Sequence, residues 1–194
     1  MHISEGILSP QALAAGWALT AGGLAAGLKK TPVEKLPETA LVSAALFLAS
    51  LVHVPLGPSS IHLTLLGLAG IMLGWSAIPA LFIALFLQGL LFQFGGLLSL
   101  GVNTAAMGTA ALTGSLVYRS LPKKLKPAGA FAGGFAAVIA GTLAVTAALV
   151  FSDGDLRTTA ALLFAANLPL AAVEGVISLF ILMFLSKTLP NYVS

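Results

Sequence analysis

Long apolar runs, separated by short breaks of polar, glycine and proline residues, dominate this chain. A helix needs roughly 20 predominantly apolar residues to cross the hydrocarbon core of a bilayer. The third run is short and rich in glycine, which suits a helix that is partly buried in protein rather than exposed to lipid. The pattern predicts an all-α integral membrane protein with about seven transmembrane helices, in one domain over residues 1–194. We expect these helices near 10–29, 36–55, 62–75, 77–95, 104–121, 126–151 and 158–187.

The composition agrees with this pattern and narrows the function. The 194-residue chain is 58% hydrophobic and only 8% charged, with a mean hydropathy of +1.04. A soluble domain carries about 25% charged residues, so this chain cannot cover a surface that faces water. Its basic residues lie in short connections, which does not favour nucleic-acid binding. The sequence has neither a Gly-x-x-x-x-Gly-Lys-Ser/Thr run nor a His-Glu-x-x-His pair, so we expect no enzyme, and any ATP hydrolysis must come from another subunit.

The basic residues also predict an orientation in the membrane. Eight of them fall in alternate connections or at the C-terminus, and only Arg157 falls on the opposite side. Cytoplasmic loops carry the excess of lysine and arginine, so seven helices with this bias place the C-terminus in the cytoplasm and the N-terminus outside. The N-terminal segment 1–9 and the loop 56–62 then share the external face. The eight residues are Lys29, Lys30, Lys35, Arg119, Lys123, Lys124, Lys126 and Lys187.

The N-terminus itself is a candidate metal ligand. The chain begins MHISEG, without the positive region of a signal peptide, so we expect this terminus to be the mature one. The amine of Met1, the backbone amide of His2 and the imidazole of His2 can bind one ion in fused rings, which favour a flat arrangement. Tetragonal nitrogen ligation suits Ni(II) or Cu(II), with Co(II) close, whereas Zn(II) prefers a tetrahedron. The chain has no cysteine, which excludes thiolate ligands.

Two further histidines lie near the same predicted face. His62 follows Ser59 and Ser60 in a Gly-Pro-Ser-Ser loop, where it can supply a fourth nitrogen or cap the following helix, and the serines can support it. His53 lies near the end of the second predicted helix, just before Pro55. We favour a buried His53 bonded to a backbone carbonyl. The alternatives are that it supports a metal ligand or is itself the fourth ligand.

Five other polar residues lie in or beside the apolar runs. Amides in a membrane usually form hydrogen bonds between helices, which is our expectation for Gln88. Gln93 and Asn103 flank an external glycine-rich turn, so both are candidates to line the site. Glu5 is expected to bond to the His2 ring or to a loop amide. An ionisable residue as deep as Glu174 is costly, so it either serves function or coupling or locks the helices together.

These residues resemble the CbiM/NikM family, the substrate-binding (S) components of energy-coupling-factor transporters for cobalt and nickel. The resemblance covers essentially the whole chain and implies the general six-helix S-component fold with an added N-terminal helix that carries the ligand segment. It also implies that the amine of Met1, the amide and imidazole of His2, and the imidazole of His62 bind the metal. The residues that carry it are MHI-x-EG at 1–6, GPSSIHL at 57–63 with Gly67, QFGGL at 93–97 and LGVN at 100–103.

The resemblance further implies partners in the cell membrane of a prokaryote. They are a transmembrane coupling (T) subunit, two cytosolic ATPase subunits and often a small accessory membrane protein. Two features depart from the family pattern. Phe94 stands just before the Gly-Gly turn, where many members have Asp or His, and His53 is not part of the shared motifs.

The sequence therefore predicts a multi-pass subunit that captures Ni(II) or Co(II) as a transported substrate, with no cofactor of its own. It does not choose between the two metals, because both accept the same nitrogens. Two other functions stay open. One is an S-component-like carrier of a small organic molecule, with His2 incidental, and the other is an assembly subunit that binds no substrate.

Overall fold

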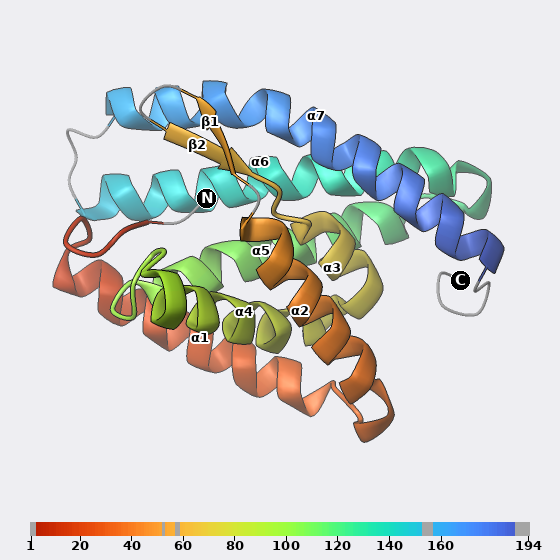
Figure 1. Cartoon of the computed structure of the whole chain (residues 1–194), viewed down its shortest axis with the longest axis horizontal. Coiled ribbons are helices and arrows are strands. Elements are labelled where there is room, and N and C mark those ends of the chain that lie inside the picture. Colours follow the sequence, from red (N-terminus) through yellow and green to blue (C-terminus); the bar gives the residue numbers. More distant parts are fainter. Residues whose placement is uncertain (1–2, 52, 57–58, 153–156, 189–194) are drawn as a thin grey trace.

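Helices account for most of the computed structural model, which describes residues 3–51, 53–56, 59–152 and 157–188 and is shown in Figure 1. The side chains of residues 53–56, 59–61 and 157–160 lie outside that description. Each helix expected from the apolar runs has a helical counterpart in the same chain order. The helices are α1 (Pro10–Lys29), α2 (Leu36–Leu51), α3 (Leu66–Leu73), α4 (Ala77–Phe92), α5 (Leu100–Ser120), α6 (Lys126–Ser152) and α7 (Arg157–Thr188).

A β-hairpin interrupts this helical pattern, and the sequence did not predict it. Strands β1 (His53–Leu56) and β2 (Ser59–His62) pair antiparallel, and the register sets His53 opposite His62. The second helix therefore ends at Leu51 rather than at residue 55, and the expectation that His53 is helical was wrong. Pro55 supplies the reason, since proline disfavours the helical conformation of the residue before it and cannot continue a helix.

Two other helix boundaries shift in a way that affects the candidate site. Helix α4 ends at Phe92, because Gln93 takes a left-handed conformation with φ of 59°. Helix α5 starts at Leu100 rather than at residue 104, directly after Ser99. Asn103 therefore lies in the first turn of α5 instead of in the preceding loop.

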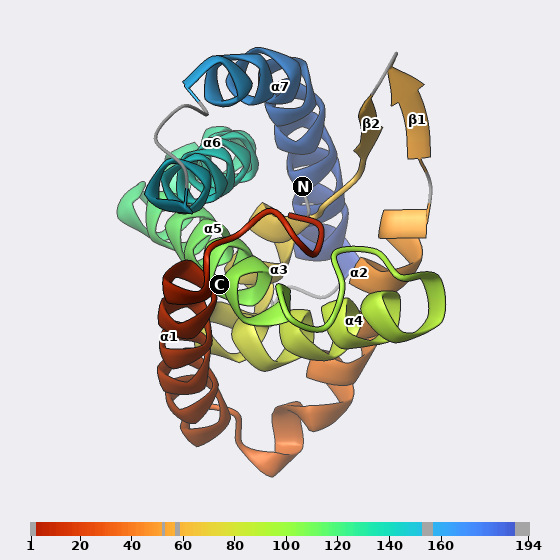
Figure 2. The ribbon, with the colours of Figure 1, turned by 90° about the vertical axis from the view of Figure 1, so that its left-hand side faces the viewer.

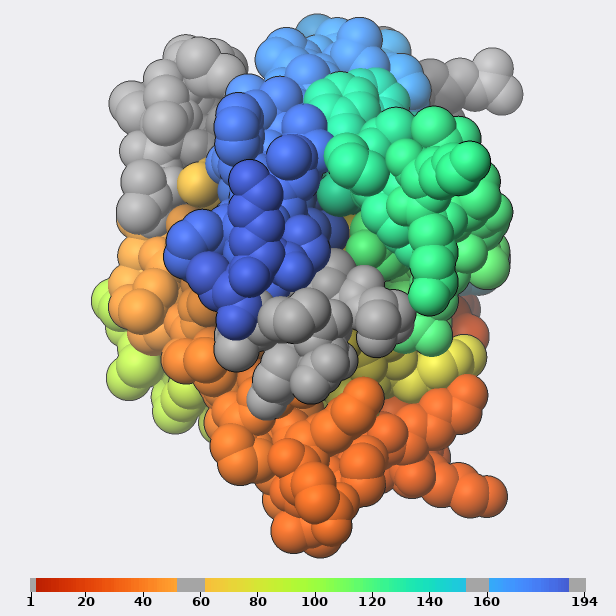
Figure 3. All heavy atoms as spheres, turned by 90° about the vertical axis from the view of Figure 1, so that its right-hand side faces the viewer, coloured from red at the N-terminus to blue at the C-terminus, as the bar shows by residue number. Residues whose placement is uncertain are grey.

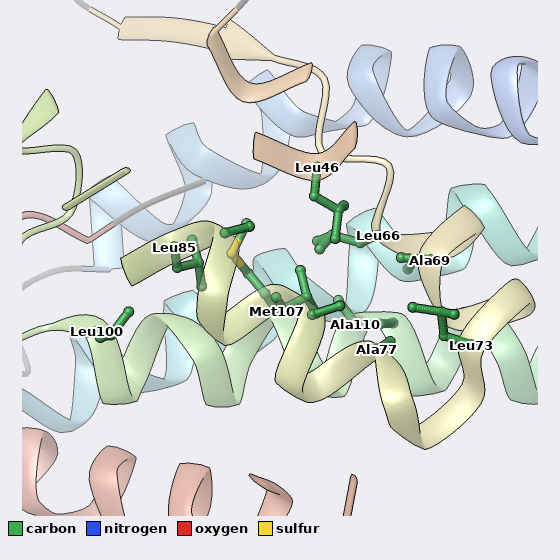
Figure 4. Close-up of a cluster of buried hydrophobic side chains, with 14 residues drawn as sticks. Leu46, Leu66, Ala69, Leu73, Ala77, Leu85, Leu100, Met107 and Ala110 are labelled. Carbon is green, nitrogen blue, oxygen red and sulfur yellow. The ribbon is translucent and has the colours of Figure 1, made fainter. Parts of the chain in front are cut away.

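Helix α5 contacts α1, α3, α4 and α6, so it forms the centre of the bundle. Figure 4 shows the largest apolar cluster beside it, in which Leu66, Leu85 and Met107 come from three different helices. The short α3 lies directly against the backbones of its neighbours. A Cβ built on Gly67 would lie 2.5 Å from Cα of Gly134, and one on Gly70 would overlap the carbonyl of Ala111. Small residues thus permit the close helix contacts that are common in membranes.

Three helical segments of the described residues are long and apolar enough to cross a membrane, which supports a membrane protein. They are Leu66–Phe92, Lys123–Ser152 and Ala161–Thr188. Helices α6 and α7 pack side by side, and Figure 3 shows them from the end where α7 finishes. Large apolar side chains on them, such as Phe180 at 67% exposure and Leu143 at 54%, suit contact with lipid. The seven-span count and the orientation stay predictions.

Candidate metal centre

The start of the chain is held by one buried side chain of α5. The backbone N–H of Ile3 donates to Oδ1 of Asn103 over 2.9 Å, and Nδ2 of Asn103 donates to the carbonyl of Ile3 over 3.0 Å. Both residues are buried. The amide thus pairs with both polar groups of residue 3 and fixes the point to which Met1 and His2 are attached. Met1 and His2, the first two ligands expected from the sequence, lie outside the described residues.

The loop between α4 and α5 gives this N-terminal segment a second attachment. The N–H of Leu98 donates to Oε1 of Glu5 over 2.8 Å, which is the loop-amide contact expected for Glu5. Gly96 has φ of 86°, and a Cβ there would overlap the Glu5 side chain. Ser99 accepts from Nδ2 of Asn103 over 3.3 Å and donates to the carbonyl of Gly95. Figure 2 shows the segment in red, beside the green loop that holds it.

His62 ends strand β2, and its side chain is buried at 6% exposure. Its Nδ1 lies 3.2 Å from the carbonyl oxygen of Leu63. A carbonyl oxygen only accepts, so this contact favours the tautomer with the proton on Nδ1. Histidines that bind metals usually donate their other ring N–H in this way. The local geometry therefore gives His62 the tautomer that a metal ligand needs.

A buried carboxyl group fixes the residues that follow His62. Glu174, from the middle of α7, is fully buried, and its Oε1 accepts from the N–H and the hydroxyl of Thr64. Both carboxyl oxygens lie 3.0 Å from the N–H of Leu65. Leu65 has φ of 51°, a left-handed conformation in which the chain turns into α3. Because Glu174 contacts this segment, it lies beside the candidate site and not only between helices.

A small cavity lies against His62. Its volume is about 10 Å³, which is room for a single water molecule. Its polar lining comes from Ser50, His62, Thr64 and Gln88. Among the described residues, Oε1 of Gln88 has no hydrogen-bond partner, so the helix-to-helix bond expected for this amide is not made by its oxygen. Through this cavity Gln88 becomes a polar neighbour of His62, which the sequence did not indicate.

Met107 lies between the anchor of residue 3 and the cavity of His62. It lines the cavity beside His62, and it lies one helical turn from Asn103 on α5. Side chains four positions apart share one face of a helix. The anchor of Ile3 and the cavity of His62 therefore lie along the same face of α5, although residues 3 and 62 are far apart in the sequence.

The remaining sequence candidates lie at the edge of this arrangement. Gln93 is exposed at the end of α4. Ser59 and Ser60 lie in β2, and His53 lies opposite His62 in β1, but the side chains of these three residues lie outside the described part. Their roles stay predictions. Within the described residues no three His, Cys, Asp or Glu side chains come together.

Ser99 and Thr64 are polar contributors that the sequence reasoning missed. Ser99 directly precedes α5, a position where a polar residue commonly marks a helix start, so it had a local signal. Thr64 had none, because its partner Glu174 is 110 positions away.

Known proteins resemble this chain over most of its length. The family model "Cobalt uptake substrate-specific transmembrane region" matches residues 2–192. A Haemophilus influenzae protein named as a metal transport protein is 38% identical, covering 98% of this chain and 96% of that protein. The fused nickel transport protein NikMN of Rhodobacter capsulatus is 33% identical, covering 60% of this chain and 35% of that protein. A crystal structure of a transition metal transporter has a TM-score of 0.76 at 28% identity, covering 97% of this chain and 93% of that one.

Proposed function

Because the chain belongs to the family of cobalt-uptake substrate-specific transmembrane regions, we propose that it is the membrane subunit that captures Ni(II) or Co(II) for ATP-driven uptake. The observation that carries the proposal is that both candidate ligand segments lie along one face of α5. Asn103 holds residue 3, and one turn further on Met107 borders the cavity of His62. One segment that can supply nitrogen ligands is thus anchored to α5, and the other lies beside a cavity on the same face of that helix.

The proposed ligands are the terminal amine of Met1, the amide and imidazole of His2, and Nε2 of His62. The ion is the transported substrate and not a resident cofactor. The amine and the His2 amide must lose protons when the metal binds, and the imidazoles must be neutral. The contact of Nδ1 with the Leu63 carbonyl favours a His62 tautomer that would bind the ion through Nε2. Four nitrogens in a flat arrangement suit Ni(II), with Co(II) close.

Other subunits must supply the energy. A coupling membrane subunit and two cytosolic ATPases would reorient this subunit and release the ion on the inner side, and a small accessory membrane protein would assist. The fused relative NikMN supports such association, since its name joins two transport components in one chain. The segment 1–9 would be the external metal-binding part of a single transmembrane domain.

The cavity size favours an ion over an organic substrate. Sites for small organic molecules usually have volumes of about 300–1,000 Å³. The cavity at His62 holds about one water molecule. Two larger grooves, of about 440 and 430 Å³, run along α1 and α5, but their linings are mainly apolar and include no histidine.

Metal analysis of the purified chain tests the proposal. The protein is produced with its native N-terminus in cells grown with both nickel and cobalt, and its metal content is measured. We expect about one Ni(II) or Co(II) per chain, and a yellow, diamagnetic complex with Ni(II), because four flat nitrogens give a strong ligand field. A metal-free protein that binds neither ion in calorimetry would overturn the proposal. A paramagnetic nickel complex would exclude the flat nitrogen site.

A further inference from the structure

Glu174 is the one fully buried carboxyl group among the described residues, and the proposed metal ligation does not use it. A carboxyl group inside an apolar bundle is costly unless it forms several hydrogen bonds. Its bonds here do not go to the middle of a neighbouring helix. They go to Thr64 and Leu65, which follow His62 directly.

One peptide unit connects Glu174 to the imidazole of His62. The carbonyl of Leu63 and the N–H of Thr64 belong to the same planar peptide group. The carbonyl end accepts from Nδ1 of His62, and the N–H end donates to Oε1 of Glu174. Because the group is planar, fixing its N–H end also fixes the direction of its carbonyl. Hydrogen bonds in such a chain also polarise and strengthen each other.

The carboxyl group itself is held on a rigid base. A Cβ built on Gly134 of α6 would lie 2.7 Å from the backbone carbonyl of Glu174, so α7 lies directly against the α6 backbone at this point. Gly67, in the first turn of α3, touches Gly134 in the same way. The start of α3, the middle of α6 and the middle of α7 therefore meet at backbone contact distance. Glu174 has little freedom to follow the His62 segment if that segment moves.

We propose that Glu174 is a positioning residue that orients the His62 imidazole toward the metal through the Leu63–Thr64 peptide group. This inference rests on the proposed function, because it assumes that His62 binds the metal. A residue that merely locks α7 to α3 would stabilise the fold without affecting the ring. If Glu174 is a positioning residue, substituting it should no longer change metal affinity once His62 is also removed.

A double-mutant cycle separates these two roles. Ni(II) binding to the full chain with its native N-terminus is measured by calorimetry for wild type, Glu174→Ala, His62→Ala and the double variant. We expect Glu174→Ala to weaken binding about 10–100-fold, the usual loss when the partner of a ligating histidine is removed. The double variant should bind no more weakly than His62→Ala alone. Losses that multiply in the double variant would overturn the proposal.

The absorption spectrum of bound nickel gives a second reading that a stability effect would not change. A histidine nitrogen replaced by water weakens the ligand field, so the visible band should move to longer wavelength in both Glu174→Ala and His62→Ala. Added free imidazole should reverse that shift in both variants. An unshifted band in Glu174→Ala, together with wild-type affinity of the folded fraction, would contradict the role.

Matched variants keep the test decisive. Ser178 is fully buried one turn further along α7, and among the described residues its hydroxyl has no hydrogen-bond partner, so Ser178→Ala should bind nickel like wild type. Glu174→Gln keeps one acceptor oxygen and should show a smaller loss, and it replaces Glu174→Ala in the cycle if the alanine variant does not fold. If His62→Ala binds Ni(II) like wild type, the proposed function fails. If His62→Ala loses binding but Glu174→Ala binds like wild type, only the present inference fails and the proposed function stands.

Discussion

The two segments that would meet at the metal are held in different ways. Residue 3 is attached by the amide of Asn103, and Glu5 adds one bond to a loop at an exposed edge. The His62 segment continues from a strand into α3 and is fixed by a fully buried carboxyl group. A hydrogen bond contributes a net of about 0.5–1.5 kcal/mol, whereas a buried donor left without a partner costs about 1–3 kcal/mol. Both halves therefore depend on buried hydrogen bonds, and they differ in the helix that holds them, which is α5 for the N-terminal half and α7 for the His62 half.

The largest effect should come from lengthening the N-terminal half. One glycine added before Met1 moves the amine out of its chelate ring, so we expect tight Ni(II) binding to be abolished. Calorimetry on protein whose N-terminus is verified by mass spectrometry measures this. The same residue added after Ser194 is the control and should have no effect. Unchanged affinity with the N-terminal glycine would remove the amine from the site.

Removing the histidine of the His62 half should have the next largest effect. His62→Ala should eliminate most Ni(II) binding, because it deletes the proposed fourth nitrogen. His53→Ala, opposite it in the hairpin, should weaken binding by no more than about 10–100-fold, as expected for a residue that supports a ligand. Equilibrium titrations of both variants give the ranking. The reverse ranking would assign the fourth nitrogen to His53.

Lowering the pH should weaken binding mainly through the N-terminal half. Protons compete with the metal for the same nitrogens, and the amine titrates near about 7.7–8.0 and an imidazole near about 6.5. Affinity is therefore greatest above about pH 8 and falls as the pH drops through these values to about 6. In His62→Ala the residual binding should keep its slope between about pH 8 and 7, where the amine titrates. Constant affinity over this range would argue against a ligating amine.

Loosening the anchor of the N-terminal segment should have the smallest effect. Asn103→Ala removes both bonds to Ile3 but no ligand, so we expect a loss of about 10–100-fold in Ni(II) affinity. Asn167→Ala is the matched control, because this buried amide bonds only to the Leu163 carbonyl of its own helix among the contacts described. Stopped-flow dissociation of bound metal should show faster release only for Asn103→Ala. Equal effects of the two variants would mean that the anchor does not matter.

The sequence predicted the helices because apolar length and glycine-rich breaks are local signals. It missed the hairpin, since the apolar residues around Pro55 extend the preceding run and hide the strand. It flagged Glu174 by its depth in the membrane and Asn103 by its place beside an external glycine-rich turn, but it could not name their partners. Ile3 lies 100 positions from Asn103, and Thr64 lies 110 from Glu174, so only the packing of helices brings them together. The ligand roles of Met1, His2 and His62 stay predictions.

The glycine contacts of α3 limit which mutations this region can accept during evolution. Every missense change in a glycine codon adds at least a Cβ, and at Gly67 and Gly70 that atom would meet a neighbouring backbone rather than a movable side chain. These positions should therefore be as intolerant in a mutational scan as the ligands themselves, although neither carries a metal-binding group. Gly67 lies five positions after His62, so the positions that do not tolerate substitution would include residues near the site that bind no metal.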